Sequence, residues 1–248
     1  MMANLKYEFI KLFTVRSTYV LTLLTLALSM LIMIVTVAKT PNLHELVTAD
    51  AFKQLFLDAP LISTLVGAVV AILIVGQEYR YNTIAYTLTA SRSRAEILIA
   101  KTLVTLFFSI SLALAAIVLV LTCFYTGLSI RDSSLALPGF SADVAGTLLR
   151  SLLHCGGIAL FALLLASLVR NITFAIVAFF MIPTIEQLLG IVLKNNIVYL
   201  PATALEQVNA AVTADPLATP LKGGLIFLVY LVVGSAISYL LFVRRDAN

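Results

Sequence analysis

The sequence predicts an all-α membrane protein with six transmembrane helices, an N-terminal amphipathic helix in the membrane interface, and both termini in the cytoplasm. Three observations support this prediction. Of the 248 residues, 61% are hydrophobic and only 11% are charged, whereas soluble domains contain about 25% charged residues. The apolar residues form several runs long enough to cross a hydrocarbon core of about 30 Å as a helix. The basic residues cluster at the ends of these runs, as in chains oriented in a bilayer.

Residues 2–16 have the pattern of a helix that lies flat in the interface. Apolar side chains recur at helical spacing on one face: Leu5, Phe9, Leu12 and Phe13. Charged side chains fall elsewhere on the helix: Lys6, Glu8 and Lys11. This segment is therefore expected to lie on the bilayer surface before the chain first crosses it.

Six apolar runs then follow along a single membrane domain, 1–248, that no low-complexity linker divides. The predicted spans are residues 17–38, 59–76, 102–126, 151–169, 172–193 and 224–243. A loop at 77–101 and a longer segment at 194–223 connect spans on opposite sides. Short helices are expected around Phe52 and Phe56 and at 205–212. Only Arg170 and Asn171 separate the fourth and fifth spans, which predicts a tight helical hairpin.

Lysine and arginine residues divide unevenly between the two sides of these spans. Ten fall on one side: Lys6, Lys11, Arg16, Arg80, Arg92, Arg94, Lys101, Arg170, Arg244 and Arg245. Six fall on the other: Lys39, Lys53, Arg131, Arg150, Lys194 and Lys222. Because cytoplasmic loops carry the excess of basic residues, both termini and residues 77–101 are predicted to be cytoplasmic, with 194–223 outside. This orientation, rather than a nucleic-acid partner, explains the net charge of +4.

Sequence patterns of catalytic and metal sites are missing from the chain. It has no G-x-x-x-x-G-K-[ST] phosphate loop, no H-E-x-x-H and no G-x-S-x-G, and its two histidines, His44 and His154, are far apart. We therefore expect no catalytic residue, no metal site and no enzyme activity in this chain. Cys123 and Cys155 have no metal or disulfide spacing and are expected to be small buried side chains. Both lie toward the predicted outer side, so a bond between them stays open.

Residues 76–101 are the one place where charge is concentrated between two apolar runs. The charged residues there are Glu78, Arg80, Arg92, Arg94, Glu96 and Lys101. Ser93 and Glu96 form a capping box, so the third spanning helix is expected to begin there, about two turns before Lys101. Residues 79–89 can form a short helix, which two rigid spans would hold below the membrane and which could transmit force. The alternative is an ordinary basic loop that only orients the chain.

Glu186 is the ionisable residue within a predicted span, and such residues are functional candidates because burying a charge in the membrane is costly. Pro183 is expected to loosen the helix nearby, and Gln187 adds polarity. Glu186 is expected about 21 Å from the cytoplasmic end of its helix, in the outer half of the membrane. Two interpretations stay open: a residue of a substrate path, or one that hydrogen-bonds within the bundle or marks its outer mouth.

The chain as a whole resembles the ABC-2 type permeases, the membrane subunits of ATP-binding cassette exporters. The resemblance covers the flat N-terminal helix, the six spans with both ends inside, the long cytoplasmic loop and the long outer segment. Locally it depends on Glu78, Thr83-Ile84, Leu88-Thr89, residues 91–94 and Lys101-Thr102-Leu103. The chain departs from the family pattern at Asn82, where Gly is usual, and at Ala90, near a usual Pro.

The resemblance implies a bacterial cytoplasmic membrane protein with two kinds of partner. These are a second permease subunit, identical or related, and a cytoplasmic ATPase that carries the ATP and Mg²⁺. Five residues would contact the ATPase or support that contact: Glu78, Arg80, Thr83, Arg92 and Arg94. The second and fifth spans would line a substrate path, with Pro183, Glu186 and Gln187 as its candidate residues.

Three hypotheses about function follow from the sequence. The first is an exporter permease for an amphipathic substrate such as an antimicrobial peptide, a drug or a lipid-like molecule. The second is a stand-alone channel or ion-coupled transporter that uses Glu186. The third is a membrane immunity or accessory protein that binds a peptide without transporting it.

Overall fold

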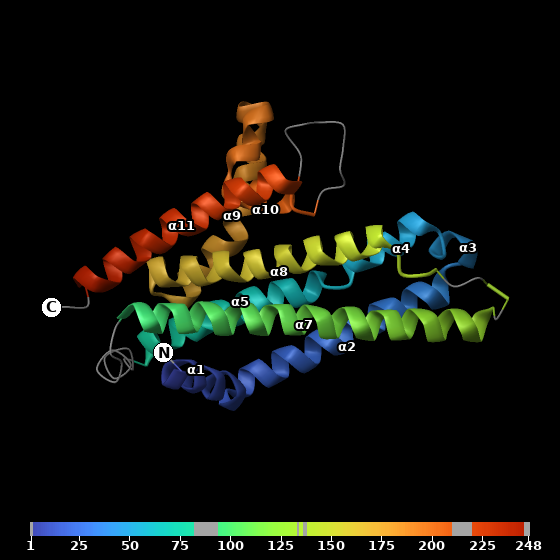
Figure 1. The fold of residues 1–248 in the computed structure, drawn as a ribbon, viewed down its shortest axis with the longest axis horizontal. Helices are drawn as coiled ribbons and strands as arrows, with labels where there is room; N and C mark the ends of the chain where they lie inside the picture. The colour runs from blue at the N-terminus through green and yellow to red at the C-terminus, as the bar shows by residue number, and fades with distance from the viewer. Residues whose placement is uncertain (1, 82–93, 133, 136–137, 210–219, 246–248) are drawn as a thin grey trace.

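The computed structural model describes residues 2–81, 94–132, 134–135, 138–209 and 220–245, and within these ranges it is helical without a β-strand (Figure 1). The elements are α1 (Met2–Thr14), α2 (Arg16–Lys39), α3 (Leu43–Leu46), α4 (Ala49–Asp58), α5 (Leu61–Arg80), α7 (Arg94–Arg131), α8 (Ala142–Val169), α9 (Ile172–Leu193), the 3-10 helix η1 (Lys194–Tyr199), α10 (Pro201–Glu206) and α11 (Pro220–Arg245). In the described residues, six helical segments are long and apolar enough to cross a membrane. This is the composition of a multi-pass membrane protein.

The helices agree with the predicted spans in number and order but extend beyond several of them. α7 continues past the predicted end of the third span to Arg131, because a glycine at 127 costs a helix only about 1 kcal/mol and Leu128 beyond it is buried. α8 begins at Ala142, where the Ser141 hydroxyl accepts a hydrogen bond from the Val144 backbone N–H at 3.3 Å. The connection implied by the predicted bounds of the third and fourth spans, residues 127–150, is therefore too long.

The short helices in the connections follow their capping residues. The helix expected around Phe52 and Phe56 is α4, which begins after Thr48, whose hydroxyl accepts from the Ala51 backbone N–H. Of the helix expected at 205–212, only residues 205 and 206 are helical, at the end of α10 (Pro201–Glu206); residues 207–209 form a turn, and 210–212 lie outside the described residues. The first residue of α10 is a proline, which fits the first turn of a helix because it lacks an N–H that would go unbonded there. α7 is described from Arg94, and Ser93 of the predicted capping box lies outside the described residues, so the start of this helix at Ser93 stays a prediction.

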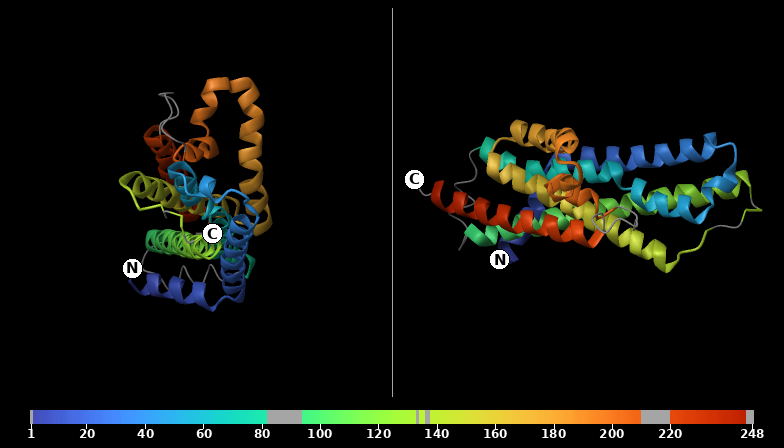
Figure 2. Two further views of the ribbon diagram at one scale, coloured as in Figure 1. Left: turned by 90° about the vertical axis from the view of Figure 1, so that its right-hand side faces the viewer. Right: turned by 90° about the horizontal axis from the view of Figure 1, so that it is seen from above.

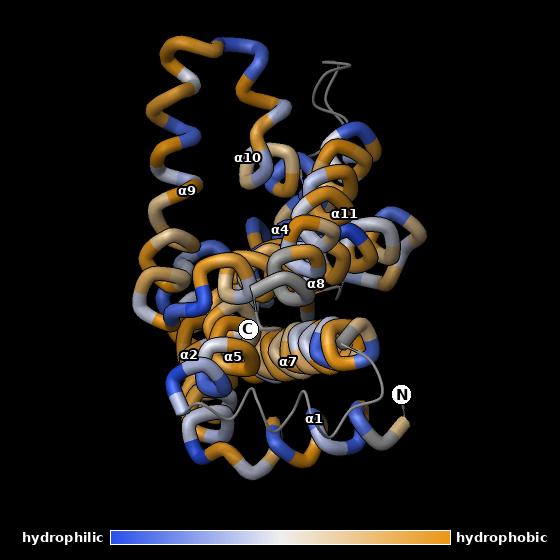
Figure 3. Tube along the Cα trace, turned by 90° about the vertical axis from the view of Figure 1, so that its left-hand side faces the viewer, coloured by the Kyte–Doolittle hydropathy of each residue, from blue (hydrophilic) through white to orange (hydrophobic). Residues whose placement is uncertain are grey.

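Four long helices, α2, α5, α7 and α8, run along the long axis of the molecule (Figures 1 and 2). α1 lies across one end of this bundle, as the view along its axis shows (Figure 3). α9 leaves the bundle obliquely, and η1 and α10 lead the chain back to it (Figures 2 and 3). The described ends of α1 and α11 lie at the same end of the bundle (Figure 1), as an even number of crossings requires. The side of the membrane on which they lie stays a prediction.

The core of the bundle is built from small residues that let the helices approach closely. Ala68 and Ala71 of α5 and Ala159 and Ala162 of α8 are all completely buried in one apolar cluster. Small side chains at such contacts are typical of membrane helices, where close backbone packing replaces the hydrophobic effect as the main source of association.

The far end of α2 is tied to the end of α7 by Arg131. Its Nη1 donates hydrogen bonds to the carbonyl oxygens of Val37, Ala38 and Thr40. The last carbonyls of a helix have no partner within it, and a cation there also complements the helix dipole. Arg131 therefore holds the α2–α7 pair together at the end opposite α1.

We expect Gly76→Ala to destabilise the protein, whereas Gly146→Ala does not. A Cβ atom at position 76 would overlap Cγ1 of Ile172, at the start of α9, whereas one at position 146 meets no atom within 4 Å. Both changes add about 1 kcal/mol of helix propensity, but overpacking at position 76 is expected to cost about 1–3 kcal/mol. Thermal unfolding in detergent measures the difference. Equal midpoints for the two variants would show that α9 is not held against α5.

Candidate functional site

The residues predicted to face a partner lie partly outside the described chain. Thr83 and Arg92 fall in the segment 82–93, as does Ser93 of the capping box, and the structure gives no account of them. Arg94 is the first residue of α7. Glu78 and Arg80 both lie in the last turn of α5, which ends at Arg80. The structure thus describes the two helices that flank the segment, and their facing ends form the candidate site.

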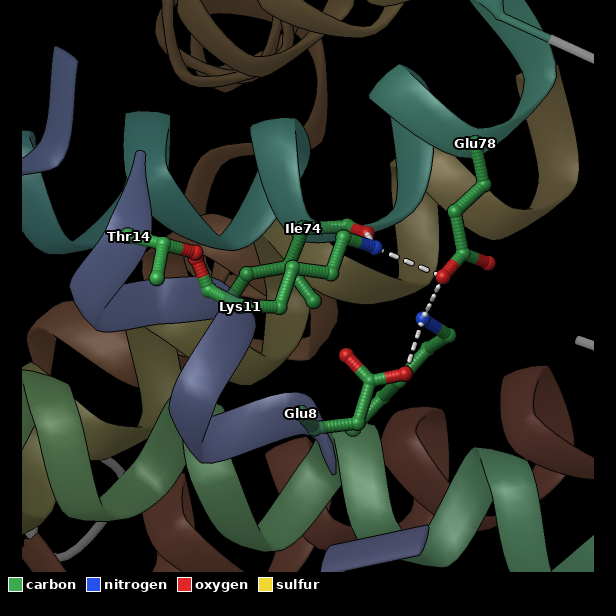
Figure 4. Close-up of polar contacts among 6 residues, drawn as sticks. Glu8, Lys11, Thr14, Ile74 and Glu78 are labelled. Carbon is green, nitrogen blue, oxygen red and sulfur yellow. Dashed lines mark hydrogen bonds and ion pairs between the residues drawn. The ribbon is translucent and has the colours of Figure 1, made fainter. Parts of the chain in front are cut away.

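Four charged side chains meet where α1 crosses the ends of α5 and α7. Lys101 Nζ of α7 donates to Glu8 Oε1 of α1 and to Glu78 Oε1 of α5, each at 2.7 Å. Lys11 Nζ of α1 donates to the same Glu78 oxygen at 2.6 Å and to the Ile74 carbonyl at 3.3 Å. Figure 4 shows Glu8 and Lys11 reaching from α1 toward Glu78. We call these four residues the charge cluster.

The charge cluster is buried, which makes its internal pairing obligatory. Glu8, Glu78 and Lys101 are each 3% exposed or less, while Lys11 retains partial exposure. Its two carboxylates and two ammonium groups balance, so no net charge is left in the low-dielectric interior. Removing one partner of a buried pair typically costs about 3–5 kcal/mol, because it leaves an uncompensated charge.

Glu8 and Lys11 are the two members of the charge cluster on α1, which is not one of the spanning helices. Burial, and then the neighbouring Lys101 ammonium, lower the pKa of Lys11 below its ordinary value, while the carboxylates of Glu78 and Glu8 act in the opposite direction. Lys11 therefore loses its proton at a lower pH than a free lysine would. The ion-pair partner of Lys11 is Glu78. Its Oε1 accepts hydrogen bonds from the ammonium groups of Lys11 and Lys101, and its Oε2 is buried without a hydrogen-bond partner among the described residues.

The sequence predicts Glu78 as a site residue but places its partners on α1 wrongly. Glu8 was expected away from the apolar face, yet it lies on the same face as Leu5 and Leu12, which contact the core. Phe13, expected on that face, is 49% exposed. The spacing of the residues could have predicted the buried position of Glu8, since residues 5, 8 and 12 lie on one face of a helix. Because Glu78 is 2% exposed, it stabilises the end of α5 from inside the bundle and not at its surface.

Arg80 lies on the outside of the same end of the bundle. It is exposed, its guanidinium lies 5.7 Å from the centre of the Tyr81 ring, and it lines a hollow of about 470 Å³. The hollow lies between the end of α5 and the turn from α8 to α9. Its other lining residues are Gly76, Tyr79, Arg170, Asn171, Ile172 and Thr173. Arg170 caps α8 in a left-handed conformation, φ 58°, and lies 5.4 Å from the centre of the Tyr79 ring. Two arginines thus border one surface recess.

Glu186 is far from the charge cluster and holds the chain between α9 and α10. It is 4% exposed, and its carboxylate accepts hydrogen bonds from Ala202 N at 3.0 Å, Thr203 N at 2.8 Å and Thr203 Oγ1 at 2.9 Å. These donors lie in the first turn of α10, whose backbone N–H groups have no partner within the helix. Gln187 beside it is exposed, and Pro183 is a half-buried residue inside α9. A role of these three residues in a substrate path stays a prediction.

The described residues contain no group of three His, Cys, Asp or Glu side chains that could hold a metal ion. Cys123 and Cys155 are both free, and Cys155 Sγ lies 2.9 Å from Thr64 Oγ1. Comparisons of the chain with protein-family models, with curated proteins and with solved structures found no match. The interpretation of the site therefore depends on its own geometry.

A double-mutant cycle on the charge cluster is expected to show strong coupling. Glu8→Gln leaves the buried cluster with one excess positive charge and Lys101→Gln leaves it with one excess negative charge, each at an expected cost of about 3 kcal/mol. The double variant removes one charge of each sign and leaves the Lys11–Glu78 pair, so its cost should fall below the sum by about 0.5–3 kcal/mol. Unfolding in detergent gives the four free energies. Lys6→Gln, an exposed lysine on the same helix, is the control, and additive costs would contradict the pairing.

Glu186→Ala is expected to loosen α10, because it leaves two partly buried backbone N–H groups and a hydroxyl without their acceptor, at about 1–3 kcal/mol. Thr203→Val removes only the hydroxyl donor and should cost less. Gln187→Ala, next to Glu186 and exposed, should change nothing. The measurement is thermal stability in detergent. Equal stability of the Glu186 and Gln187 variants would show that the hydrogen bonds to α10 do not hold it.

Proposed function

We propose that the chain is the permease subunit of an ABC-2 type exporter. It would move an amphipathic substrate, such as an antimicrobial peptide, a drug or a lipid-like molecule, across the bacterial cytoplasmic membrane. The observation that carries the proposal is the charge cluster, which joins α1 to the two helices that flank residues 82–93. A cytoplasmic ATPase would supply the ATP, the Mg²⁺ and the hydrolysis.

The charge cluster provides a route for force from the flanked segment into the bundle. Glu78 lies two residues before the end of α5, and Lys101 lies about 10 Å from the start of α7. Both are tied to α1 by ion pairs of 2.6 to 2.7 Å. A push on residues 82–93 would therefore move α1, α5 and α7 together, because separating any one would break a buried ion pair.

The recess beside Arg80 is the surface that we assign to the ATPase. Arg80 and Arg170 present positive charge there, at the end of the bundle predicted to be cytoplasmic. Because the charge cluster is buried just inside, this surface is attached to a stiff part of the protein. Thr83, Arg92 and Arg94 belong to the same proposed contact through their place in the sequence.

The proposed topology places α1 in the cytoplasmic interface and both termini in the cytoplasm. The position of α1 across the end of the bundle is the one that a helix lying flat on the membrane would take (Figure 3). Its inner face packs on α7, where Phe9 meets Phe107 with ring centres 5.1 Å apart. A second permease subunit would complete the transporter.

The substrate path is proposed between the second and fifth spans, α5 and α9. Buried residues there are apolar, among them Ile72 and Val75 of α5 and Phe179 of α9, which suits an amphipathic cargo. The competing hypothesis of ion-coupled transport would require Glu186 to bind and release a cation. Its two oxygens accept three hydrogen bonds from α10, and ion binding would compete with all of them.

The test is purification of the tagged chain in mild detergent from cells that express its natural partners. We expect a P-loop ATPase to accompany it, with two copies of each subunit in the native mass and ATP hydrolysis by the complex. If the chain is purified alone and the preparation hydrolyses no ATP, the proposal is wrong.

A charge reversal locates the contact in the same preparation. Arg80→Glu is expected to reduce the recovered ATPase about tenfold, because reversed charge at an interface opposes a complementary partner. Arg16→Glu is the matched control, an exposed arginine at the same end of the bundle. Equal recovery from both variants would leave the partnership in place but remove Arg80 from the contact.

A further inference from the structure

An apolar groove of about 710 Å³ lies between α7, α8, α10 and α11. Its volume falls within the range of about 300–1,000 Å³ that is usual for ligand sites. Leucines form most of its walls: Leu149, Leu153 and Leu160 of α8, and Leu221, Leu225 and Leu228 of α11. Arg150 is the charged residue among the described residues that line it.

The groove exists because α8 and α11 diverge. They touch at one end, where Ser238 Oγ donates to Ser167 Oγ at 2.7 Å and Gly234 lies against Leu164. From there the two helices separate toward their first residues (Figure 1). The groove is open along its side, since Leu153 on one wall is 58% exposed and Leu228 on the other is 55% exposed. The groove therefore opens toward the hydrocarbon that surrounds a spanning bundle.

The depth of Arg150 places the groove in one leaflet. Arg150 is nineteen residues from Val169, the end of α8, which corresponds to about 28 Å along a helix. This equals the thickness of a hydrocarbon core, about 30 Å, so Arg150 lies at headgroup level when Val169 lies at the opposite boundary. From Arg150 to Leu160 the groove runs about 15 Å, half the membrane.

We propose that the groove binds an anionic phospholipid, with an acyl chain along its leucines and the phosphate at Arg150. Guanidinium groups bind phosphate well because their donors match its oxygens. The Arg150 Nη2 also donates to Thr147 Oγ1 at 3.2 Å, which holds the guanidinium near the groove. A spanning helix of a second protein would need the full membrane thickness, whereas the groove is one leaflet long. The proposal does not rest on the exporter function; on the predicted topology the leaflet is the outer one.

The chain contains no tryptophan, so one introduced tryptophan reports on the lipid beside it. Leu153→Trp places the reporter in the groove, one helical turn from Arg150. The purified protein in vesicles is then exposed to brominated phosphatidylglycerol or brominated phosphatidylcholine, which quench fluorescence on contact. We expect about fivefold preference for the anionic lipid, the effect of one basic residue at the membrane surface. Arg150→Gln in the same background should abolish the preference.

Leu31→Trp is the control, because Leu31 is an exposed residue of α2 that does not line the groove. Leu228→Trp, on the opposite wall, repeats the test in case the tryptophan at 153 fills the groove itself. Equal quenching by both lipids at 153 and 228 would show only surrounding lipid and overturn the proposal. So would protection of both positions from quenching, which would mean that another protein or a second copy covers the groove.

Discussion

The need to neutralise buried charge determines how one end of this protein is built. Lys101 and Glu78 lie inside the bundle, where an unpaired ion is several kcal/mol less stable than in water. Their pairing brings α5 and α7 together, and the further partners Glu8 and Lys11 fix the position of α1. The arrangement of three helices thus follows from one electrostatic requirement. Apolar packing on Leu12 adds to it but does not choose between neighbouring orientations of α1.

Glu78 and Glu186, the buried carboxylates of α5 and α9, are satisfied in different ways, with different mechanical results. Glu78 is neutralised by two ammonium groups on two other helices, so it joins elements that are distant in sequence. Glu186 is satisfied by backbone N–H groups and a hydroxyl of α10, only 16 and 17 residues away, so it stabilises a local turn of the chain. The first arrangement can carry force between helices, whereas the second fixes the path from α9 back to the bundle.

The spans could be predicted from the sequence because length and hydropathy are enough to identify a membrane helix. The ion pairs could not be predicted, since the stripe of residues 5, 8 and 12 indicates which face of α1 is buried but not which residue of α7 Glu8 meets. Glu78 was predicted as a site residue, but its neutralisation by Lys11 depends on residues 67 positions apart. The start of α10 was missed, although Pro201 is a residue type that favours the first position of a helix.

The local role of Glu186 also shapes the distant groove. By holding the first turn of α10, it places Leu205 in the core between α8 and α11 and Val208 beside it. These side chains occupy the space where α8 and α11 would otherwise close on each other beyond their contact at Ser167 and Ser238. The divergence of the two helices is therefore maintained by α10 at one end and by a serine pair at the other. A groove held open in this way keeps its shape without a ligand, so little conformational entropy is lost when an acyl chain enters it.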